Sequence, residues 1–259
     1  MEISGFLEHG GERLAWRRID GAAPTVVWLG GFRSDMTGTK AQALADWAAA
    51  RGRGFLRFDY SAHGQSSGDF LQGSITGWRG DALAVIDALT EGPLVLVGSS
   101  MGGWLAVLAA LARPERVQGL VLVAPAADFT ERLIEPGLSP EARRAIAEGG
   151  VWMRPSEYGD PDPITRVLLE DGARWSILPG PVTIEVPVRI LQGGADDAVP
   201  WRHALALGEA IIAQDLIFTL IRDGDHRLSR PSDIARLLAA VAEARVHQDS
   251  AKISRSPSR

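Results

Sequence analysis

Residues 94–112 read "LVLVGSSMGGWLAVLAALA" and constrain the fold more than any other stretch of the chain. A run of apolar, partly β-branched residues leads into a short stretch of glycine and serine, and an Ala/Leu-rich segment follows directly. This pattern predicts a buried strand, a tight turn and a helix with no intervening loop. A turn this short forces its central residue into a strained backbone conformation.

The turn Gly98-Ser99-Ser100-Met101-Gly102 has the form G-x-S-x-G, with Ser100 at its centre. Side chains at positions 98 and 102 would collide with the neighbouring strand and helix, so glycine fits there. The hydroxyl of the central serine then projects over the helix N-terminus, which favours negative charge. Ser100 is therefore the candidate nucleophile, and Ser99 is a small spacer. The alternative is an ordinary strand-to-helix turn in which the serine caps the helix.

A serine nucleophile needs a base, and the base needs an acid that orients it. His226 follows the last apolar strand and lies in the turn-rich stretch "LIRDGDHRL". We take it as the base, because such a loop lies at the carboxyl edge of a parallel sheet. Four histidines lie near a terminus, in an early loop or at a helix start and receive no role: His9, His63, His203 and His247.

The acid is expected where an earlier strand ends. The stretch "VRILQGGADDAVPW" closes a strand with two glycines and offers Asp196 and Asp197. We prefer Asp196 and interpret Asp197 as a loop carboxylate or helix-capping residue. Asp223 and Asp225 are too close to His226 in sequence to reach behind it, so we expect them to be solvated.

Negative charge on a reacting carbonyl needs two N–H donors. One is the backbone of Met101, directly after the nucleophile. The other is expected from the loop "WLGGFRSDM", where Gly30-Gly31 lets the backbone approach closely. We choose the N–H of Phe32; the alternative is an ordinary glycine turn.

Short β-rich runs alternate with helical stretches along most of the chain. An opening hairpin turns at Gly10-Gly11, and further strands alternate with helices expected at about 38–51, 74–90, 201–213 and 231–244. The alternation predicts an α/β fold with a mostly parallel sheet and helices on both faces. Residues 130–185 break the rhythm. We therefore expect a core of 1–129 and 186–245, a small cap insert over 130–185, and a disordered tail over 246–259.

Charge and composition exclude several classes of function. The net charge is −5 and the chain has no cysteine. The acidic balance argues against nucleic acid or an anionic membrane surface as a partner, and the missing cysteines exclude disulfides and thiolate chemistry. With no signal-like or membrane-length segment, we expect a cytoplasmic protein with no stable membrane insertion. The oligomeric state is left open.

Apolar residues of the insert are candidates for the substrate pocket. Trp152, Met153 and Trp175 can line an acyl pocket over Ser100, or they can form the insert's own small core. Three arginines of the same segment can meet a substrate carboxylate, although solvated surface positions are the commoner explanation: Arg154, Arg166 and Arg174.

The sequence resembles the α/β-hydrolase superfamily across nearly its whole length. The stretches "GFRSDMTGTK", "LRFDYSAHGQSSG", "LVGSSMGGW", "GVWMRPSEY" and "DDAVPW" resemble more narrowly the group of the abhydrolase-domain-containing protein ten. That group includes a mitochondrial serine hydrolase described as an acyl-protein (palmitoyl) thioesterase and as an acyl-glucuronide esterase. The resemblance implies the nucleophile at Ser100, the acid at Asp196 and the base at His226.

These observations predict a serine hydrolase that cleaves carboxylic esters or acyl thioesters through an acyl-enzyme. The expected partner is a small-molecule or acylated substrate, and the mechanism requires no metal and no organic cofactor. The alternatives are a peptidase or a carbon–carbon bond hydrolase on the same fold, or a non-catalytic binding module. The complete Ser/Asp/His set argues against the last, because a binding module has no need of all three.

Overall fold

One mixed sheet forms the centre of the computed structural model, which describes residues 1–155 and 161–244. Within these residues the sheet has eight strands in the order β1-β2-β4-β3-β5-β6-β10-β12. The strands are β1 (Glu2–His9), β2 (Glu12–Ile19), β3 (Ala22–Leu29), β4 (Arg53–Phe58), β5 (Leu94–Ser99), β6 (Val117–Val123), β10 (Val188–Gly193) and β12 (Leu216–Ile221). The expected tail at 246–259 lies outside the described residues.

The strand directions agree with the predicted α/β class. β1 and β2 form the opening antiparallel hairpin, and β2 pairs antiparallel with β4. From β4 to β12 every neighbouring pair is parallel. β5 lies near the middle and all six of its residues are buried, as expected for a parallel strand covered on both faces.

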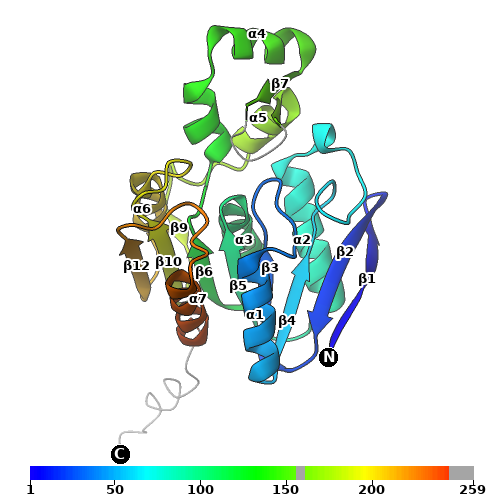
Figure 1. The fold of residues 1–259 in the computed structure, drawn as a ribbon, viewed down its shortest axis with the longest axis vertical. Coiled ribbons are helices and arrows are strands. Elements are labelled where there is room, and N and C mark those ends of the chain that lie inside the picture. The colour runs from blue at the N-terminus through cyan, green and yellow to red at the C-terminus, as the bar shows by residue number, and fades with distance from the viewer. Residues whose placement is uncertain (156–160, 245–259) are drawn as a thin grey trace, which may run out of the picture.

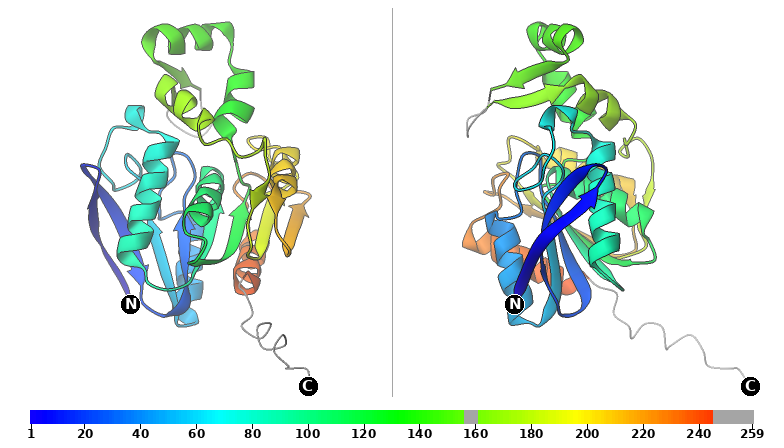
Figure 2. Two further views of the ribbon diagram at one scale, coloured as in Figure 1. Left: turned by 180° about the vertical axis from the view of Figure 1, so that it is seen from behind. Right: turned by 90° about the vertical axis from the view of Figure 1, so that its right-hand side faces the viewer.

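In the described part of the chain, helices cover both faces of this sheet (Figures 1 and 2). They are α1 (Thr39–Ala50), α2 (Ile75–Leu89), α3 (Met101–Ala112), α6 (Trp201–Ala210) and α7 (Pro231–Glu243). The buried residues of α1 and α7 pack with one face of the strands, whereas those of α2, α3 and α6 pack with the other. α3 is apolar on nearly all sides because ten of its residues are buried.

The segment between β6 and β10 rises above the carboxyl ends of the strands (Figure 1). It contains the π-helical turn η2 (Thr130–Ile134), the 3₁₀ turn η3 (Glu135–Gly137), α4 (Pro140–Gly149), β7 (Val151–Arg154), β8 (Asp162–Thr165) and α5 (Arg166–Ala173). β7 and β8 pair antiparallel as a small ribbon. The insert therefore stands over the sheet edge where the strands end.

Outside the insert, a 3₁₀ turn, η1 (Phe70–Gln72), precedes α2.

The helix expected at 201–213 ends earlier than its sequence suggests. α6 stops at Ala210, and the next two residues form β11 (Ile211–Ile212). β11 pairs in parallel with β9 (Val182–Thr183), and the Ile184 N–H donates to the Ile212 carbonyl. Tertiary pairing of two β-branched residues thus overrides helix continuation here.

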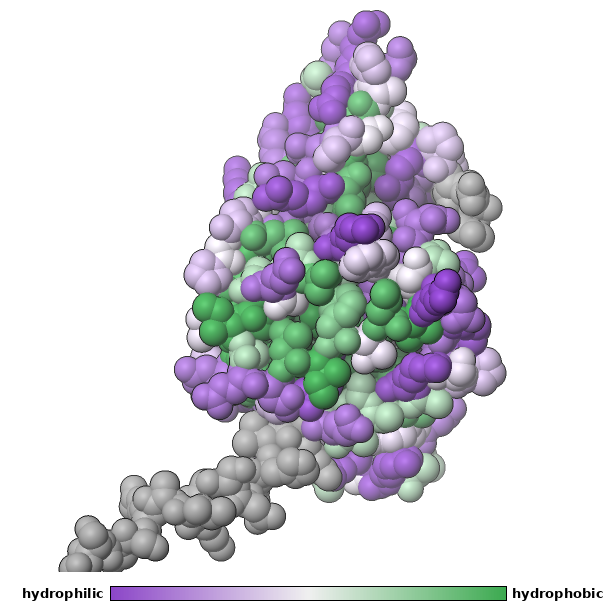
Figure 3. All heavy atoms as spheres, turned by 90° about the vertical axis from the view of Figure 1, so that its left-hand side faces the viewer, coloured by the Kyte–Doolittle hydropathy of each residue, from purple (hydrophilic) through white to green (hydrophobic). Residues whose placement is uncertain are grey.

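Apolar side chains also gather on the outer side of the sheet near β12 and α6 (Figure 3). Ile217 and Leu220 of the edge strand and Ile212 of β11 are among the exposed large apolar residues. In the part of the chain that the structure describes, no helix is both long enough and apolar enough to span a bilayer.

Candidate functional site

Ser100 occupies the tight turn between β5 and α3. Its backbone has φ 55° and ψ −122°, a conformation that a residue with a side chain rarely adopts. Neighbouring backbone holds it there: the Ser100 N–H donates to the Val123 carbonyl at 2.9 Å, and its own carbonyl accepts from Gly103 and Ala126. The Ser100 side chain makes no capping hydrogen bond to α3, so the interpretation of this serine as a helix cap is wrong.

Glycine is required on both sides of this turn because the backbones meet there. A Cβ placed on Gly98 would lie 2.1 Å from the Gly102 carbonyl oxygen. A Cβ on Gly102 would lie 2.1 Å from the Leu29 carbonyl oxygen of β3. Both distances are far below van der Waals contact, and the atoms that would be met belong to the rigid backbone.

The Ser100 hydroxyl faces a histidine and a carboxylate from two other strand ends. Ser100 Oγ lies 3.2 Å from His226 Nε2, and His226 Nδ1 lies 2.8 Å from Asp196 Oδ2. His226 comes from the loop after β12, and Asp196 from the loop after β10. The structure therefore brings together the three side chains that the sequence predicted from positions up to 126 residues apart.

Hydrogen bonds hold the Asp196 carboxylate in place within the protein. Its side chain is fully buried. Oδ1 accepts from the backbone N–H groups of Ala198 and Val199, and Oδ2 accepts from the Gln192 amide. The adjacent Asp197 is exposed. Asp196 therefore fills the position behind the histidine, and Asp197 does not.

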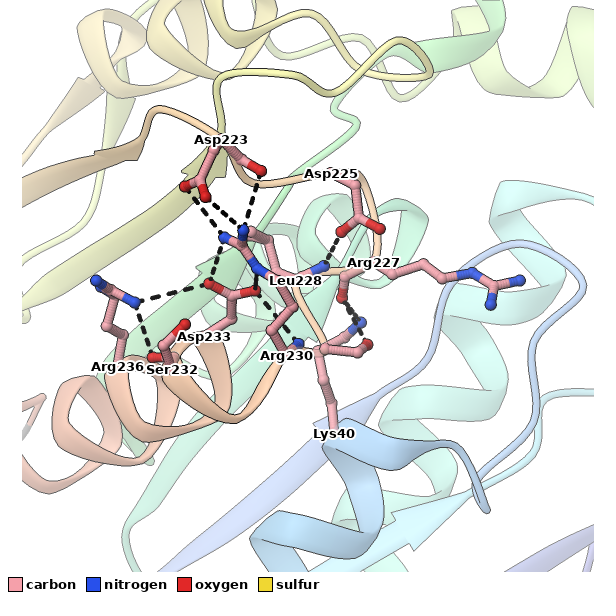
Figure 4. A network of polar contacts seen from close by, with 10 residues as sticks. Lys40, Asp223, Asp225, Arg227, Leu228, Arg230, Ser232, Asp233 and Arg236 are labelled. Carbon is pink, nitrogen blue, oxygen red and sulfur yellow. Dashed lines mark hydrogen bonds and ion pairs between the residues drawn. The ribbon is translucent and has the colours of Figure 1, made fainter.

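The loop that carries His226 is fastened by charged side chains (Figure 4). Arg230 pairs with exposed Asp223 and with buried Asp233 at the start of α7, and its guanidinium lowers the pKa of both carboxyls. Asp225 accepts from the Leu228 N–H. Lys40 donates to the Arg227 carbonyl, directly after the histidine, and burial lowers the pKa of Lys40 to about 8. Asp223 thus pairs with the Arg230 side chain and Asp225 with the loop backbone, while the carboxylate bonded to His226 is that of Asp196.

Two backbone N–H groups near Ser100 are available to a reacting oxygen. Met101 is the first residue of α3, so its N–H has no partner within the helix. Among the described residues no hydrogen bond uses the Phe32 N–H. A Cβ on Gly31 would lie 3.3 Å from Ser100 Cβ, which shows how closely the loop after β3 approaches the serine.

Two cavities meet at Ser100 and His226. One, of about 450 Å³, lies between the loop after β3 and the start of α1. Most of its wall residues are polar or charged, Ser34, Asp35 and Lys40 among them, and we call it the polar cavity. The other, of about 260 Å³, has eight apolar residues in its wall together with Ser100, Arg154, Asp162 and His226, and we call it the apolar cavity. The apolar residues come from the loop after β3, the start of α3, the η2 region and the loop before α6: Phe32, Met101, Ala126, Phe129, Leu133, Ile134, Ala198 and Val199.

An ion-pair cluster links the insert to the core beside both cavities. Asp162 of β8 accepts from Arg154 of β7 at 2.8 Å and from Arg33 of the loop after β3 at 3.2 Å. Asp162 lines both cavities. Of the three arginines singled out in the sequence, Arg154 lines the apolar cavity.

The insert residues expected to line an acyl pocket lie elsewhere. Met153 is about half exposed, and neither Trp152 nor Trp175 lines a cavity at Ser100. The Trp175 indole donates to the Thr76 hydroxyl, and its carbonyl accepts from Trp104, so this residue joins the insert to α2 and α3. In the wall of the apolar cavity, η2 and the residue before it contribute Phe129, Leu133 and Ile134, which belong to the stretch "DFTERLIEP".

No group of three or more histidine, aspartate, glutamate or cysteine side chains suited to a metal ion occurs within residues 1–155 and 161–244.

Comparison with known proteins shows which family this chain belongs to. The family model described as "Serine aminopeptidase, S33" matches residues 22–168. The chain is 36% identical to the bovine mitochondrial palmitoyl-protein thioesterase ABHD10 over 231 residues, which cover 88% of this chain and 75% of that protein. The chain belongs to the α/β hydrolases, in the family of ABHD10.

Solved structures agree with this membership. A putative hydrolase from Agrobacterium vitis superposes with a TM-score of 0.90 at 44% identity, covering 95% of this chain and 99% of that one. The mouse α/β hydrolase domain-containing protein 10 superposes with a TM-score of 0.85 at 34% identity, covering 93% and 97%. The predicted fold class and family resemblance are confirmed, and the chain is a hydrolase.

The close backbone contact at the serine turn gives a stability test. We expect Gly102→Ala to lower the free energy of unfolding by at least ~3 kcal/mol, because the added methyl group meets rigid backbone. Gly149→Ala is the matched control: it also lies in a helix, but a Cβ there meets nothing within 4 Å. That variant is expected to change stability by less than ~1 kcal/mol. Urea unfolding of both variants measures the difference; equal stabilities would contradict the contact argument.

Proposed function

We propose that this protein is a serine esterase or thioesterase that hydrolyses acyl esters or acyl thioesters through an acyl-enzyme. The observation that carries the proposal is the continuous hydrogen-bonded chain Ser100–His226–Asp196. Such a chain gives a serine hydroxyl a base and gives the base a fixed orientation.

His226 acts as the base in the first step. Its Nδ1–H donates to Asp196, which leaves the Nε2 lone pair directed at the Ser100 hydroxyl. As Ser100 Oγ attacks the carbonyl carbon, its proton passes to Nε2. The buried Asp196 carboxylate stabilises the imidazolium that forms, and its own hydrogen bonds hold it in place.

The carbonyl oxygen becomes negatively charged as the tetrahedral intermediate forms. The N–H groups of Phe32 and Met101 are the proposed donors to that oxygen. Such preorganised donors act most strongly where water is excluded, and the Met101 N–H also lies at the positive end of α3.

The intermediate then collapses to the acyl-enzyme. The C–O or C–S bond breaks, and the leaving group takes the proton from His226. Water next attacks the Ser100 acyl ester, with His226 again accepting a proton, and the acid product leaves as Ser100 is restored.

The two cavities suggest how a substrate is oriented across Ser100. We assign the acyl group to the apolar cavity beneath η2 and the leaving group to the polar cavity beside Lys40. The names of the mammalian relatives, palmitoyl-protein thioesterases, support an acylated substrate of this kind. Those relatives are named as mitochondrial; a cytoplasmic location for this chain stays a prediction from its sequence.

Covalent labelling tests the nucleophile. A fluorophosphonate probe is expected to label the wild-type protein and Ser99→Ala but not Ser100→Ala, and Ser100→Ala should lower kcat about 10³- to 10⁶-fold. Ser99→Ala is the control because it changes an adjacent hydroxyl in the same turn. Labelling that survives Ser100→Ala and disappears in Ser99→Ala would overturn the assignment.

The acid is tested by replacing each neighbouring aspartate with its amide. Asp196→Asn is expected to lower kcat about 10³- to 10⁴-fold, because an amide cannot fix the histidine tautomer or stabilise the imidazolium. Asp197→Asn changes an exposed group and should cost less than about tenfold. Steady-state kinetics with both melting temperatures recorded decide the matter. The reverse ranking would place the acid at Asp197, and small losses in both would place it on another strand end.

Acyl chain length tests the cavity assignment. Each methylene buried in the apolar cavity should contribute up to ~0.8 kcal/mol, so kcat/KM should rise along an ester series until the cavity is full. Leu133→Phe narrows that cavity and should shift the optimum to shorter chains. Met153→Phe is the control, because this side chain lies off the cavity and about half exposed. A flat profile, or an equal shift in both variants, would contradict the assignment; turnover of peptides but of no ester or thioester would favour the peptidase alternative.

A further inference from the structure

The loop that carries Phe32 is held by residues that follow β4. The Tyr60 hydroxyl donates to the Gly30 carbonyl at 3.4 Å, and the Met36 N–H donates to Asp59 Oδ1 at 2.7 Å. Between these two points, the Arg33 N–H donates to His63 Nε2 at 3.2 Å. The contact to His63 is made by the residue next to Phe32, so it is the one closest to the proposed oxyanion donor.

His63 is built into the protein as a rigid support. Only 3% of its surface is exposed. Its ring packs edge-on or tilted against three aromatic rings, with centroids 5.2–5.5 Å away: Tyr60, Phe70 and Trp78. The side chain therefore has one position, and that position fixes where its acceptor nitrogen lies.

The hydrogen bonds of His63 define its tautomer. Nδ1 lies 3.0 Å from the Ser61 carbonyl, which can only accept, so the proton is on Nδ1. Nε2 then carries the lone pair that accepts from the Arg33 N–H. Burial keeps the ring neutral by lowering the pKa of His63 to about 4, with the guanidinium of Arg33 acting in the same direction. Near neutral pH the acceptor is therefore always present.

The backbone that this bond restrains is strained. Arg33 has φ 55°, in the left-handed region that non-glycine residues seldom occupy. Without a fixed acceptor, the peptide between Phe32 and Arg33 can rotate toward a more favourable conformation, and that rotation also changes the backbone of Phe32.

We propose that His63 is a positioning residue for the oxyanion hole: its Nε2 fixes the peptide after Phe32 and thereby aims the Phe32 N–H at the space beside Ser100. His63 acts through backbone and does not contact substrate, and its ring does not line either cavity at Ser100. This inference rests on the proposed function, since it assigns a role within the same acyl-transfer step.

Three substitutions distinguish the effect of losing the hydrogen-bond acceptor at His63 Nε2 from the effect of losing the packing of the ring. His63→Gln keeps an oxygen acceptor that can reach the Arg33 N–H. His63→Met has similar length but no comparable acceptor. His63→Asn retains a donor for the Ser61 carbonyl but has no atom at the position of Nε2, and it provides the same test should the Met variant fold poorly. Melting temperatures show which variants are folded.

Two measurements report on the oxyanion hole. One is the second-order rate of labelling by a fluorophosphonate, whose phosphoryl oxygen enters the same hole. The other is the separate determination of kcat and KM with a 4-nitrophenyl ester. We expect His63→Met and His63→Asn to lower the labelling rate and kcat about 10- to 100-fold with KM within about twofold, because loss of a donor outright costs about 10²–10³. His63→Gln should recover to within about fivefold of wild type.

Labelling and kcat at wild-type values in folded His63→Met or His63→Asn would overturn the proposal. So would a His63→Gln variant as slow as His63→Met, because the ring's packing and not its acceptor would then matter. A wild-type protein that is labelled but hydrolyses no ester or thioester would refute the proposed substrate class, while the labelling rates would still decide the role of His63.

Discussion

The contact between backbones at the junction of β5 and α3 is the constraint on which the rest of the site depends. The chain can turn from a buried strand into a buried helix within one residue only if Gly98 and Gly102 carry no side chain. The turn requires a strained backbone conformation at Ser100. Hydrogen bonds to Val123 of β6 and to Ala126 after it hold that conformation. This turn places the serine hydroxyl within reach of His226, directly before the N-terminus of α3.

The groups proposed to act with Ser100 come from the ends of other strands of the same sheet, and each has its own supporting contacts. Asp196 is fixed by backbone N–H groups of its own loop. The His226 loop is fastened by Arg230 and Lys40 (Figure 4). The loop of Phe32 is fastened by residues that follow β4. In the proposed mechanism these contacts hold the groups in place before substrate binds, and such preorganisation is how electrostatic stabilisation avoids reorganisation during the reaction.

The sequence predicted the parts of the site that carry local signals. Ser100, Asp196 and His226 each follow a recognisable apolar strand, and the order of strand ends is enough to bring them to one edge. The lining of the apolar cavity was missed because it depends on how the insert folds back over the core. Phe129, Leu133 and Ile134 come from the π-helical turn η2 and the residue before it, and their spacing in the sequence does not show that they face the serine.

Long-range pairing explains the other differences. Ile211 and Ile212 continue a helical pattern in sequence but pair with a distant strand. The hydrogen bond from the Arg33 N–H to His63 joins residues 30 apart in the sequence, and no sequence motif predicts it.

The central claim is that Ser100 carries the acyl group during turnover. Intact-protein mass spectrometry of a reaction with a slowly hydrolysed 4-nitrophenyl ester, quenched in acid at successive times, tests it most directly. We expect a mass increase equal to the acyl group, located on the peptide that contains Ser100, which forms and decays at rates that can support kcat. Turnover that proceeds with no acyl adduct, or with the adduct on another residue, would contradict it.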